Sequence, residues 1–453
     1  MSSETARPLR VAIFGAGPSG LFLADALLKA HPGPLSIDII DRLPAPYGLV
    51  RYGVAPDHPK IKSVINTFAK TFEDERVRFL GNVAYGIDLT LEDVQRHYDV
   101  AGYAVGAAVD RALGIPGEDL DGNFSSTEFV AWYSGHPDQH SRRITLDAEA
   151  VAVIGVGNVA IDVTRILAKH VDELRPTDVP DYVIEALEKS RVRDIYLIGR
   201  RGPAQAKFTT PELRELGEIE NADLVIDPAQ LELDEASAKT VASKSALQRN
   251  LDVLRGFASK APEGRPRRVH LVFLASPIEI TGTDRVRQLV LERNRLDENE
   301  SAVGTGVREA IDVGMVFRAV GYRGIPLPGL PFDKRAHLIS NKGGRVVNET
   351  GEQVVGQYVA GWIKRGPSGV IGTNKADAAE TARAILEDLP KLPKAPEATE
   401  EALDALLRSR GVRVCLWEDW LAIDRYEREL GQKAGREERL KVTDFSELLA
   451  GRD

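Results

Sequence analysis

Two short stretches of small residues carry the most specific chemistry in this chain of 453 residues. The first follows the apolar run 11–14 and has the spacing Gly15-x-Gly17-x-x-Gly20. Small residues at these positions let the backbone approach a pyrophosphate closely, and the N-terminus of the next helix supplies unpaired N–H groups. The stretch therefore predicts a dinucleotide site between a strand and a helix.

The second stretch follows the apolar run 151–154 and has the spacing Gly155-x-Gly157-x-x-Ala160. A single motif of this kind also occurs in ordinary strand-turn-helix units that bind no nucleotide. Two motifs in one chain, each between an apolar run and a helical pattern, favour two bound nucleotides. Two such sites are typical of an electron-transfer relay.

The residues that would contact the two riboses differ in charge. The apolar run 35–40 ends at Asp41, whose carboxylate can accept hydrogen bonds from a free ribose diol, as in FAD or NAD. After the second motif, the run 195–198 leads into Arg200 and Arg201, which stand between two glycines. Guanidinium groups favour a 2′-phosphate, so the second site is predicted to prefer NADP over NAD.

Composition excludes several classes of protein. The chain has 43% hydrophobic and 28% charged residues, which is ordinary for a globular protein of two or three domains. Its net charge of −9 argues against general affinity for nucleic acid. Because Cys415 is the only cysteine, the sequence excludes disulfide frameworks, a CxxC redox pair and iron-sulfur ligation by this chain. No metal site is predicted.

Targeting signals are also missing from the sequence. The first ten residues lead into the first apolar run without an apolar leader, and no run approaches the length that spans a bilayer. A cytoplasmic location without a membrane span is therefore expected.

Basic residues gather in one part of this acidic chain. Between positions 236 and 270 there are eight of them against two acidic residues. We call them the basic island: Lys239, Lys244, Arg249, Arg255, Lys260, Arg265, Arg267 and Arg268. They are either a solvated helix and loop surface or a docking surface for an acidic partner.

The order of the predicted elements indicates an α/β fold with parallel sheets. Strands are expected near 11–14, 35–40, 98–105, 195–198, 268–273, 286–291 and 357–360, and helices near 18–30, 61–72, 159–170 and 374–386. A predicted strand is followed by a glycine at two similar places, near 106 and near 321. These two places are where we expect the chain to leave the first domain and to return to it, which suggests that one domain is inserted into another. We expect the outer domain to comprise residues 1–106 and 325–453 and the inserted domain 107–324. Residues 400–450 have a helical pattern without a readable motif.

Two longer stretches, at 46–60 and 361–372, resemble the adrenodoxin reductase family of NADPH-ferredoxin reductases, in particular its actinobacterial members. The resemblance covers nearly the whole chain and includes both motifs and the Gly-Arg-Arg-Gly turn. It implies a discontinuous FAD-binding domain with an inserted NADP-binding domain. It also implies hydride transfer from NADPH to FAD and delivery of single electrons to an acidic ferredoxin or a similar iron-sulfur protein.

The resemblance assigns further residues to the two cofactors. For FAD, the positions that match beside the first motif and Asp41 are Ala16, Pro18, Leu49, Val83, Trp362, Gly369, Val370 and Ile371. For NADP, they are Arg111, Asn158, Val159, Arg200, Arg201, Glu212 and Gly369.

The residues near 369 support a flavin independently. A glycine-rich loop precedes the predicted helix, so the N–H groups of residues 369–371 are expected to face the negative side of a reduced flavin. Trp362 is alternatively a plain core aromatic.

His58 and Glu215 match a pair near the nicotinamide that can order a water or handle a proton. They are the predicted catalytic residues, although hydride transfer between stacked rings depends more on orientation than on a protein acid or base. His58 is alternatively a residue that fixes its own turn.

Two positions depart from the pattern. Asp41 stands where the family usually has the longer Glu, so its contact with the ribose requires a water or a loop shift. Gly102 lies inside a predicted strand, where glycine is weakening.

Other functions remain open at this point. A glutamate-synthase-like electron-input flavoprotein would usually add a cysteine-rich segment, whose absence speaks against that function. A disulfide reductase is excluded, because it would need a cysteine pair. A non-catalytic regulatory protein that binds NADP or FAD is the alternative from outside the enzymes.

Overall fold

A computed structural model describes residues 7–450 of the chain. The chain forms two compact units, one built from residues up to Val109 and from Tyr322 onwards, the other from Asp110 to Gly321. The predicted fold class is confirmed: α/β with two Rossmann-like units and a helical C-terminal segment. Within residues 7–450, no helix is both long enough and apolar enough to cross a lipid bilayer.

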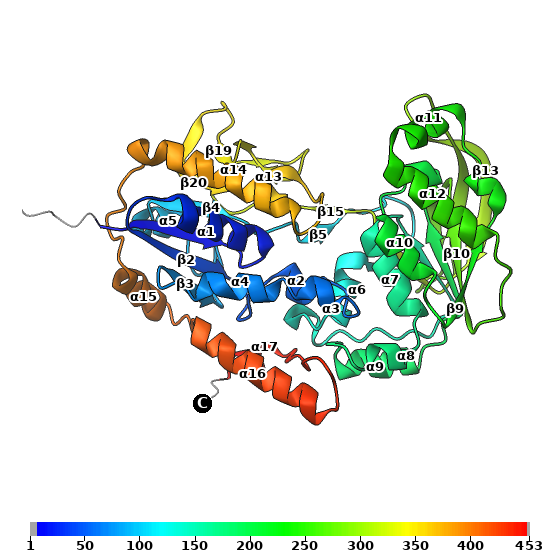
Figure 1. Cartoon of the computed structure of the whole chain (residues 1–453), viewed down its shortest axis with the longest axis horizontal. Coiled ribbons are helices and arrows are strands. Elements are labelled where there is room, and N and C mark those ends of the chain that lie inside the picture. Colours follow the sequence, from blue (N-terminus) through cyan, green and yellow to red (C-terminus); the bar gives the residue numbers. More distant parts are fainter. Residues whose placement is uncertain (1–6, 451–453) are drawn as a thin grey trace, which may run out of the picture. The chain divides into compact units, whose positions relative to one another are not determined.

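The first unit is built on a seven-stranded sheet with the order β18-β19-β20-β4-β1-β2-β3. The strands from β20 to β3 are parallel, whereas β18 and β19 are antiparallel additions at one edge. Their bounds are β1 Leu9–Phe14, β2 Leu35–Asp41, β3 Val77–Gly81, β4 Val100–Tyr103, β18 Asn341–Lys342, β19 Arg345–Val347 and β20 Gln353–Val359. The late strand β20 pairs with β4, so a segment after the second unit completes the sheet that the N-terminal residues begin (Figure 1).

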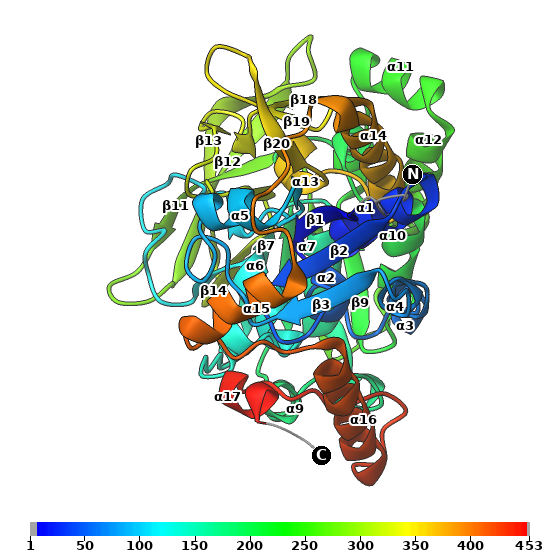
Figure 2. The same ribbon diagram turned by 90° about the vertical axis from the view of Figure 1, so that its left-hand side faces the viewer.

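Helices cover this sheet, and α1 and α14 lie side by side (Figures 1 and 2). The helices before the C-terminal segment are α1 Pro18–Ala30, α2 Leu49–Tyr52, α3 Pro59–Lys62, α4 Ile65–Phe72, α5 Leu91–His97, α13 Trp362–Arg365 and α14 Thr373–Asp388. The single helix expected over 61–72 is wrong in detail, because a turn at Ser63 and Val64 separates α3 from α4. Gly102 has a packing reason: a Cβ there would lie 2.8 Å from Cδ2 of Leu23 on α1.

The C-terminal segment attaches to the edge of the sheet at β3. The N–H of Gly81 donates to the carbonyl of Cys415 over 2.8 Å, and the reverse bond measures 2.9 Å. Burial raises the pKa of the Cys415 thiol to about 12, which makes it an inert packing residue. The helices of this segment are α15 Glu400–Ser409, α16 Trp417–Lys433 and α17 Phe445–Leu449.

Short strands complete the first unit and its connections to the second. Two pairs occur, β16 Phe332–Asp333 with β17 Leu338–Ile339, and β5 Val109–Asp110 with β15 Tyr322–Arg323. The second pair joins the two segments through which the chain passes from one unit to the other.

The second unit has a parallel six-stranded sheet with the order β6-β14-β7-β8-β10-β9. The strands are β6 Asn123–Ser125, β7 Ala150–Ile154, β8 Asp194–Ile198, β9 Ala222–Ile226, β10 Arg267–Val272 and β14 Met315–Arg318. The helices are α6 Ser126–Tyr133, α7 Asn158–Ala168, α8 Val171–Leu174, α9 Asp181–Glu188, α10 Thr210–Leu216, α11 Glu235–Ser243 and α12 Ser245–Ala258.

A second, antiparallel sheet lies over one face of this core. It consists of β11 Ala275–Thr281, β12 Gln288–Leu296 and β13 Ala302–Asp312. Leu289 and Leu291 of β12 share a buried cluster with Ile154 and Ile198 of the parallel sheet. The strand expected at 286–291 therefore exists, but in a three-stranded sheet that the sequence did not reveal.

Candidate nucleotide-binding sites

The first glycine motif forms the predicted turn between β1 and α1. Gly15 has a φ of +109°, and a Cβ there would lie 2.5 Å from the carbonyl oxygen of Ala104, so only glycine fits. Gly20 is equally constrained, because its Cβ would meet the Gly15 carbonyl oxygen at 2.0 Å. Gly17 caps α1 without a side-chain hydrogen bond, and Pro18 is the first helical residue. The first turn of α1 thus keeps N–H groups for an anionic ligand, which fits a pyrophosphate.

Asp41 ends β2 and is tied to the same loop. Its Oδ2 accepts a hydrogen bond from the N–H of Ala16 over 2.8 Å, and its Oδ1 accepts one from Leu43 over 2.9 Å. Burial raises the pKa of the Asp41 carboxyl, and these two N–H donors oppose that shift. Each oxygen has a second lone pair, so the ribose contact stays a prediction that the geometry allows.

Two further predicted FAD contacts lie next to these groups. The N–H of Val83, a buried residue, donates to the carbonyl of Asp41 over 3.0 Å. Leu49 begins α2 with 49% of its surface exposed, directly after Gly48. A Cβ on Gly48 would come within 3.0 Å of the Gly17 Cα, so the two loops touch through their backbones.

Trp362 and the loop after it form the other predicted flavin contact. Trp362 begins α13, is partly exposed, and stacks on Tyr322 with ring centroids 5.7 Å apart. Its Nε1 donates to the carbonyl of Ser368 over 3.3 Å. Trp362 is therefore held by the loop rather than buried in the core.

The predicted row of N–H groups at residues 369–371 needs a correction. The helix α14 begins at Thr373, and the N–H of Val370 already donates to Oγ1 of Thr373 over 3.1 Å. Within the part of the chain that the structure describes, the N–H groups of Gly369 and Ile371 have no hydrogen-bond acceptor. The positive φ of Gly369, +81°, lets the loop turn just before the helix. Two donors, not three, remain for a ligand.

Arg365 holds this loop and was missed in the sequence, although it lies inside the 361–372 stretch. Its guanidinium donates to the carbonyl and the hydroxyl of Ser368 and, over 2.8 Å, to Oδ1 of Asn374. Oγ of Ser19, in the first turn of α1, donates to the same oxygen over 3.1 Å. These contacts connect the 366–372 loop to the N-terminus of α1.

The second glycine motif forms the turn between β7 and α7. Gly155 has a φ of +134°, and a Cβ there would lie 2.2 Å from the carbonyl oxygen of Ala319. Gly157 caps α7 without a side-chain hydrogen bond, and nothing lies within 4 Å of where its Cβ would be. Asn158 begins the helix, with its Oδ1 accepting from the N–H of Thr209 over 2.9 Å. Val159 and the buried Ala160 follow in the first turn.

Arg200 and Arg201 are held by their backbone while their side chains stay available. Nδ2 of Asn294 donates to the Arg200 carbonyl over 2.7 Å, and the N–H of Leu274 donates to the Arg201 carbonyl over 3.1 Å. Among residues 7–450, neither guanidinium has a hydrogen-bond or ion-pair partner. The preceding Gly199 packs against Val156, so this turn lies beside the second motif. The arrangement fits a phosphate on the ribose.

Arg111 follows β5 at the start of the second unit. Its N–H donates to the Gly321 carbonyl over 2.9 Å, and its side chain is exposed. The role of Arg111 in NADP binding therefore stays a prediction.

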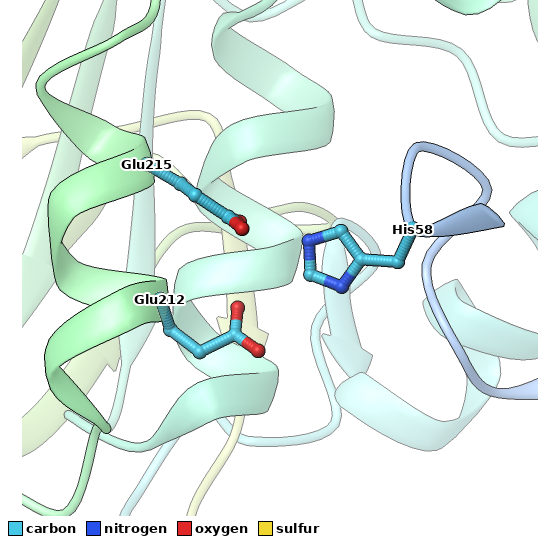
Figure 3. A group of neighbouring side chains, drawn as sticks. All are labelled: His58, Glu212 and Glu215. Carbon is cyan, nitrogen blue, oxygen red and sulfur yellow. The ribbon is translucent and has the colours of Figure 1, made fainter. Parts of the chain in front are cut away.

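Glu212 and Glu215 project from one face of α10 (Figure 3). Both are held by Arg165 of α7, a buried arginine that sequence reasoning missed. Its Nη1 lies 2.9 Å from Glu215, 3.4 Å from Glu212 and 3.1 Å from Asp162. The only sequence signal for this arginine is its place in the mainly apolar second half of α7.

His58 precedes α3 in the first unit and is also labelled in Figure 3. Its carbonyl accepts hydrogen bonds from the N–H groups of Ile61 and Lys62 over 3.1 and 3.2 Å. The main chain of His58 thus helps to form the turn. The role of its side chain, including the pairing with Glu215, stays a prediction.

Comparison with known proteins gives close relatives over the whole length. No protein-family model matches the chain. The NADPH-ferredoxin reductase FprA of Mycobacterium leprae is 45% identical over 450 residues, with 97% of each chain covered. The mitochondrial NADPH:adrenodoxin oxidoreductase of Arabidopsis thaliana is 41% identical over 467 residues, covering 99% of this chain and 96% of its own.

The solved structure of Mycobacterium tuberculosis FprA in complex with NADPH matches this fold with a TM-score of 0.92. The two sequences are 42% identical, and the match covers 98% of this chain and 99% of the other. The family predicted from the residues is thereby confirmed. The chain belongs to the family of NADPH-ferredoxin reductases of the adrenodoxin reductase type.

Proposed function

We propose that this protein is an FAD-dependent NADPH:ferredoxin oxidoreductase, with FAD in the first unit and NADPH in the second. The observation that carries the proposal is the pair of motifs with uncapped helix N-termini, the second of them beside two arginines whose side chains are available. When bound, FAD supplies the chemistry that accepts an electron pair as hydride and passes electrons on singly.

In the first unit, the residues bind and orient the flavin nucleotide. The first turn of α1 holds the pyrophosphate, and Asp41 lies where it can accept from the adenosine ribose. Leu49, Val83 and Trp362 surround the cofactor, while the N–H groups of residues 369 and 371 offer hydrogen bonds to it. These donors favour negative charge, which stabilises the reduced cofactor.

In the second unit, the first turn of α7 holds the pyrophosphate of NADPH, and Arg200 and Arg201 hold the 2′-phosphate. Arg111 and Glu212 are proposed to complete the binding site, with Gly369 near the nicotinamide. Orientation of the two rings is the main contribution of the protein to hydride transfer. His58 and Glu215 are proposed to order a water or to carry a proton beside them.

The partner is proposed to be an acidic ferredoxin or a similar iron-sulfur protein. The basic island supports this only in part, because three of its members have structural roles. Arg268 pairs with Asp194 over 2.6 Å, Arg265 donates to the Ile219 carbonyl over 2.6 Å, and Arg267 donates to the Leu167 carbonyl.

Four other members of the island, Lys244, Arg249, Arg255 and Lys260, have exposed side chains without a partner in residues 7–450. These four are the better candidates for docking an acidic surface. We propose a cytoplasmic location as well, where NADPH and reduced iron-sulfur proteins coexist. Cell fractionation tests it.

The proposal is tested by an anaerobic titration of the purified protein with NADPH, and separately with NADH, followed by addition of an oxidised ferredoxin. Bleaching of the flavin absorbance by NADPH, with electrons appearing on the ferredoxin, is the expected result. Bleaching without electron transfer to a ferredoxin would show that the protein is an NADPH-dependent flavoprotein whose partner is not a ferredoxin. No bleaching favours the non-catalytic binding protein.

A further inference from the structure

A buried ion pair connects the C-terminal segment to the loop that follows Gly48. Arg51 on α2 and Glu427 on α16 lie 376 residues apart in sequence, and they are only 3% and 0% exposed. Nη1 of Arg51 donates to Oε2 of Glu427 over 2.9 Å, and Nη2 donates to Oε1 over 2.5 Å. Such a two-bond contact fixes the orientation of both side chains as well as their distance.

The C-terminal segment holds the Glu427 carboxylate in place from its own side. Nη1 of Arg439 donates to Oε2 over 3.2 Å, and the N–H of Val442 donates to Oε1 over 2.9 Å. Arg439 is itself paired with Asp424 over 2.5 Å. Burial alone would raise the pKa of Glu427, but Arg51 and Arg439 lower it, so the carboxylate stays ionised.

Two further residues of the same segment, Lys441 and Trp420, contact α2 and the loop before it. Nζ of Lys441 donates to the carbonyl of Arg51 over 3.0 Å. The guanidinium carbon of Arg51 lies 4.9 Å from the centre of the Trp420 ring, and the Tyr47 ring meets Trp420 edge-on at 5.9 Å. We call Trp420, Glu427 and Lys441 the tail clamp.

One residue that the tail clamp contacts, Tyr47, also touches the first glycine motif. Tyr47 has a φ of +81°, in the left-handed region where a tyrosine persists only if its surroundings hold it. Its N–H donates to the carbonyl of Ala16 over 2.8 Å. The next residue, Gly48, makes the close approach to Gly17.

We propose that the tail clamp positions the 47–52 loop against the FAD motif and thereby sets how slowly FAD leaves the protein. The inference rests on the proposed flavin site in the first unit. Trp420, Glu427 and Lys441 act through Tyr47 and Arg51, so they are positioning residues for the cofactor. The C-terminal segment is then part of the flavin site rather than an additional packing layer.

The test is the rate of FAD release from the purified holoprotein, followed by the flavin fluorescence that appears on dilution. The variant is Glu427→Gln, and the matched control is Asp388→Asn. Asp388 is also a buried carboxylate of the first unit and is bound to Arg345 and Tyr358. It ends α14, and the contact of that helix with Ser19 of α1 lies at its other end, at Asn374. Both changes are isosteric and should lower the melting temperature.

The expected result is release of FAD about tenfold faster from the Glu427→Gln protein, because a charged Arg51 loses its ionic partner and the loop loosens. Release from the Asp388→Asn protein should stay within about twofold of the wild type. Equal release rates from the two variants would overturn the proposal.

A milder variant keeps the test decisive if Glu427→Gln does not fold. Lys441→Met removes one contact to the Arg51 carbonyl and should speed release roughly threefold. An unchanged release rate in this variant would also overturn the proposal. If the wild-type protein holds no FAD, the proposed function is wrong. If the wild-type protein holds FAD and NADPH bleaches it, the proposed function stands, and the release rates of the variants then test the tail clamp alone.

Discussion

Arg165 donates a hydrogen bond to Glu215 over 2.9 Å, and this single buried guanidinium also lies against Glu212 and Asp162. This cation therefore lies within 3.4 Å of three carboxylates on two helices, α7 and α10. Glu215 is positioned by this contact, so its proposed role beside the nicotinamide depends on Arg165. The arginine is a positioning residue for the predicted NADP contacts of α10.

Replacing Arg165 with Met should destabilise the second unit by about 3 kcal/mol, because three acidic groups lose their shared cation. Urea unfolding followed by circular dichroism measures the change. The FAD content should be unaffected, since the proposed FAD site lies in the first unit. A stability equal to that of the wild type would show that the three carboxylates do not depend on this arginine.

Replacing Arg200 and Arg201 together with Ala should weaken NADPH binding by about 2–4 kcal/mol, because charge-assisted bonds to a phosphate dianion are lost. NADH binding should change little, because NADH lacks that phosphate. Titration of the protein with each nucleotide measures both affinities. Equal loss for the two nucleotides would remove the assignment of these arginines to the 2′-phosphate.

Replacing Lys244, Arg249, Arg255 and Lys260 with Gln should slow reduction of an acidic ferredoxin roughly tenfold at low salt and less at high salt. Reduction of a small dye by the same protein should be unchanged. The control is Arg268→Gln, which breaks the pair with Asp194 and should lower stability instead. If the rates of dye reduction and of ferredoxin reduction fall equally, these four residues are not the docking surface.

Asp93 gives a pH-dependent contribution to stability. Burial alone would raise its pKa, but hydrogen bonds from Arg410 and Thr90 outweigh it and lower the pKa to about 2. Because the unfolded carboxyl titrates near about 3.9, the stabilisation is complete above that pH and is lost as the pH falls toward 2.

The Asp93→Asn protein should accordingly be less stable than the wild type by about 1 kcal/mol at pH 7. This gap should narrow as the pH is lowered from 5 to 3. Urea midpoints of both proteins across that range measure it. A gap that stays constant with pH would contradict the assignment.

Local patterns predicted most of the core strands and helices, because each of these elements has its own apolar run or helical periodicity in the sequence. The first motif and its flanking runs correspond to β1 and α1, and α1 begins at Pro18 as expected. The hairpin of β12 and β13 escaped notice, because an exposed strand with two glycines, such as β13, resembles a loop in composition.

The candidate site was predicted where a motif is local and missed where its support is distant. Arg200 and Arg201 stand in a turn that lies beside the second motif. Glu427, by contrast, reaches Arg51 across 376 residues, and only the folded chain brings these two together. Ion pairs of this kind leave no periodic signal in the sequence, so no local pattern could have indicated them.

The insertion of one unit into the other also sets an order of events during synthesis. The hydroxyl of Tyr103 in β4 donates to Gln357 of β20, which the ribosome adds 254 residues later. At a synthesis rate of about 5–20 residues per second, β20 is added roughly 10 to 50 s after β4. The inserted unit is contiguous in sequence, so it can fold during this interval. The first sheet is therefore completed only after the whole inserted unit has been synthesised.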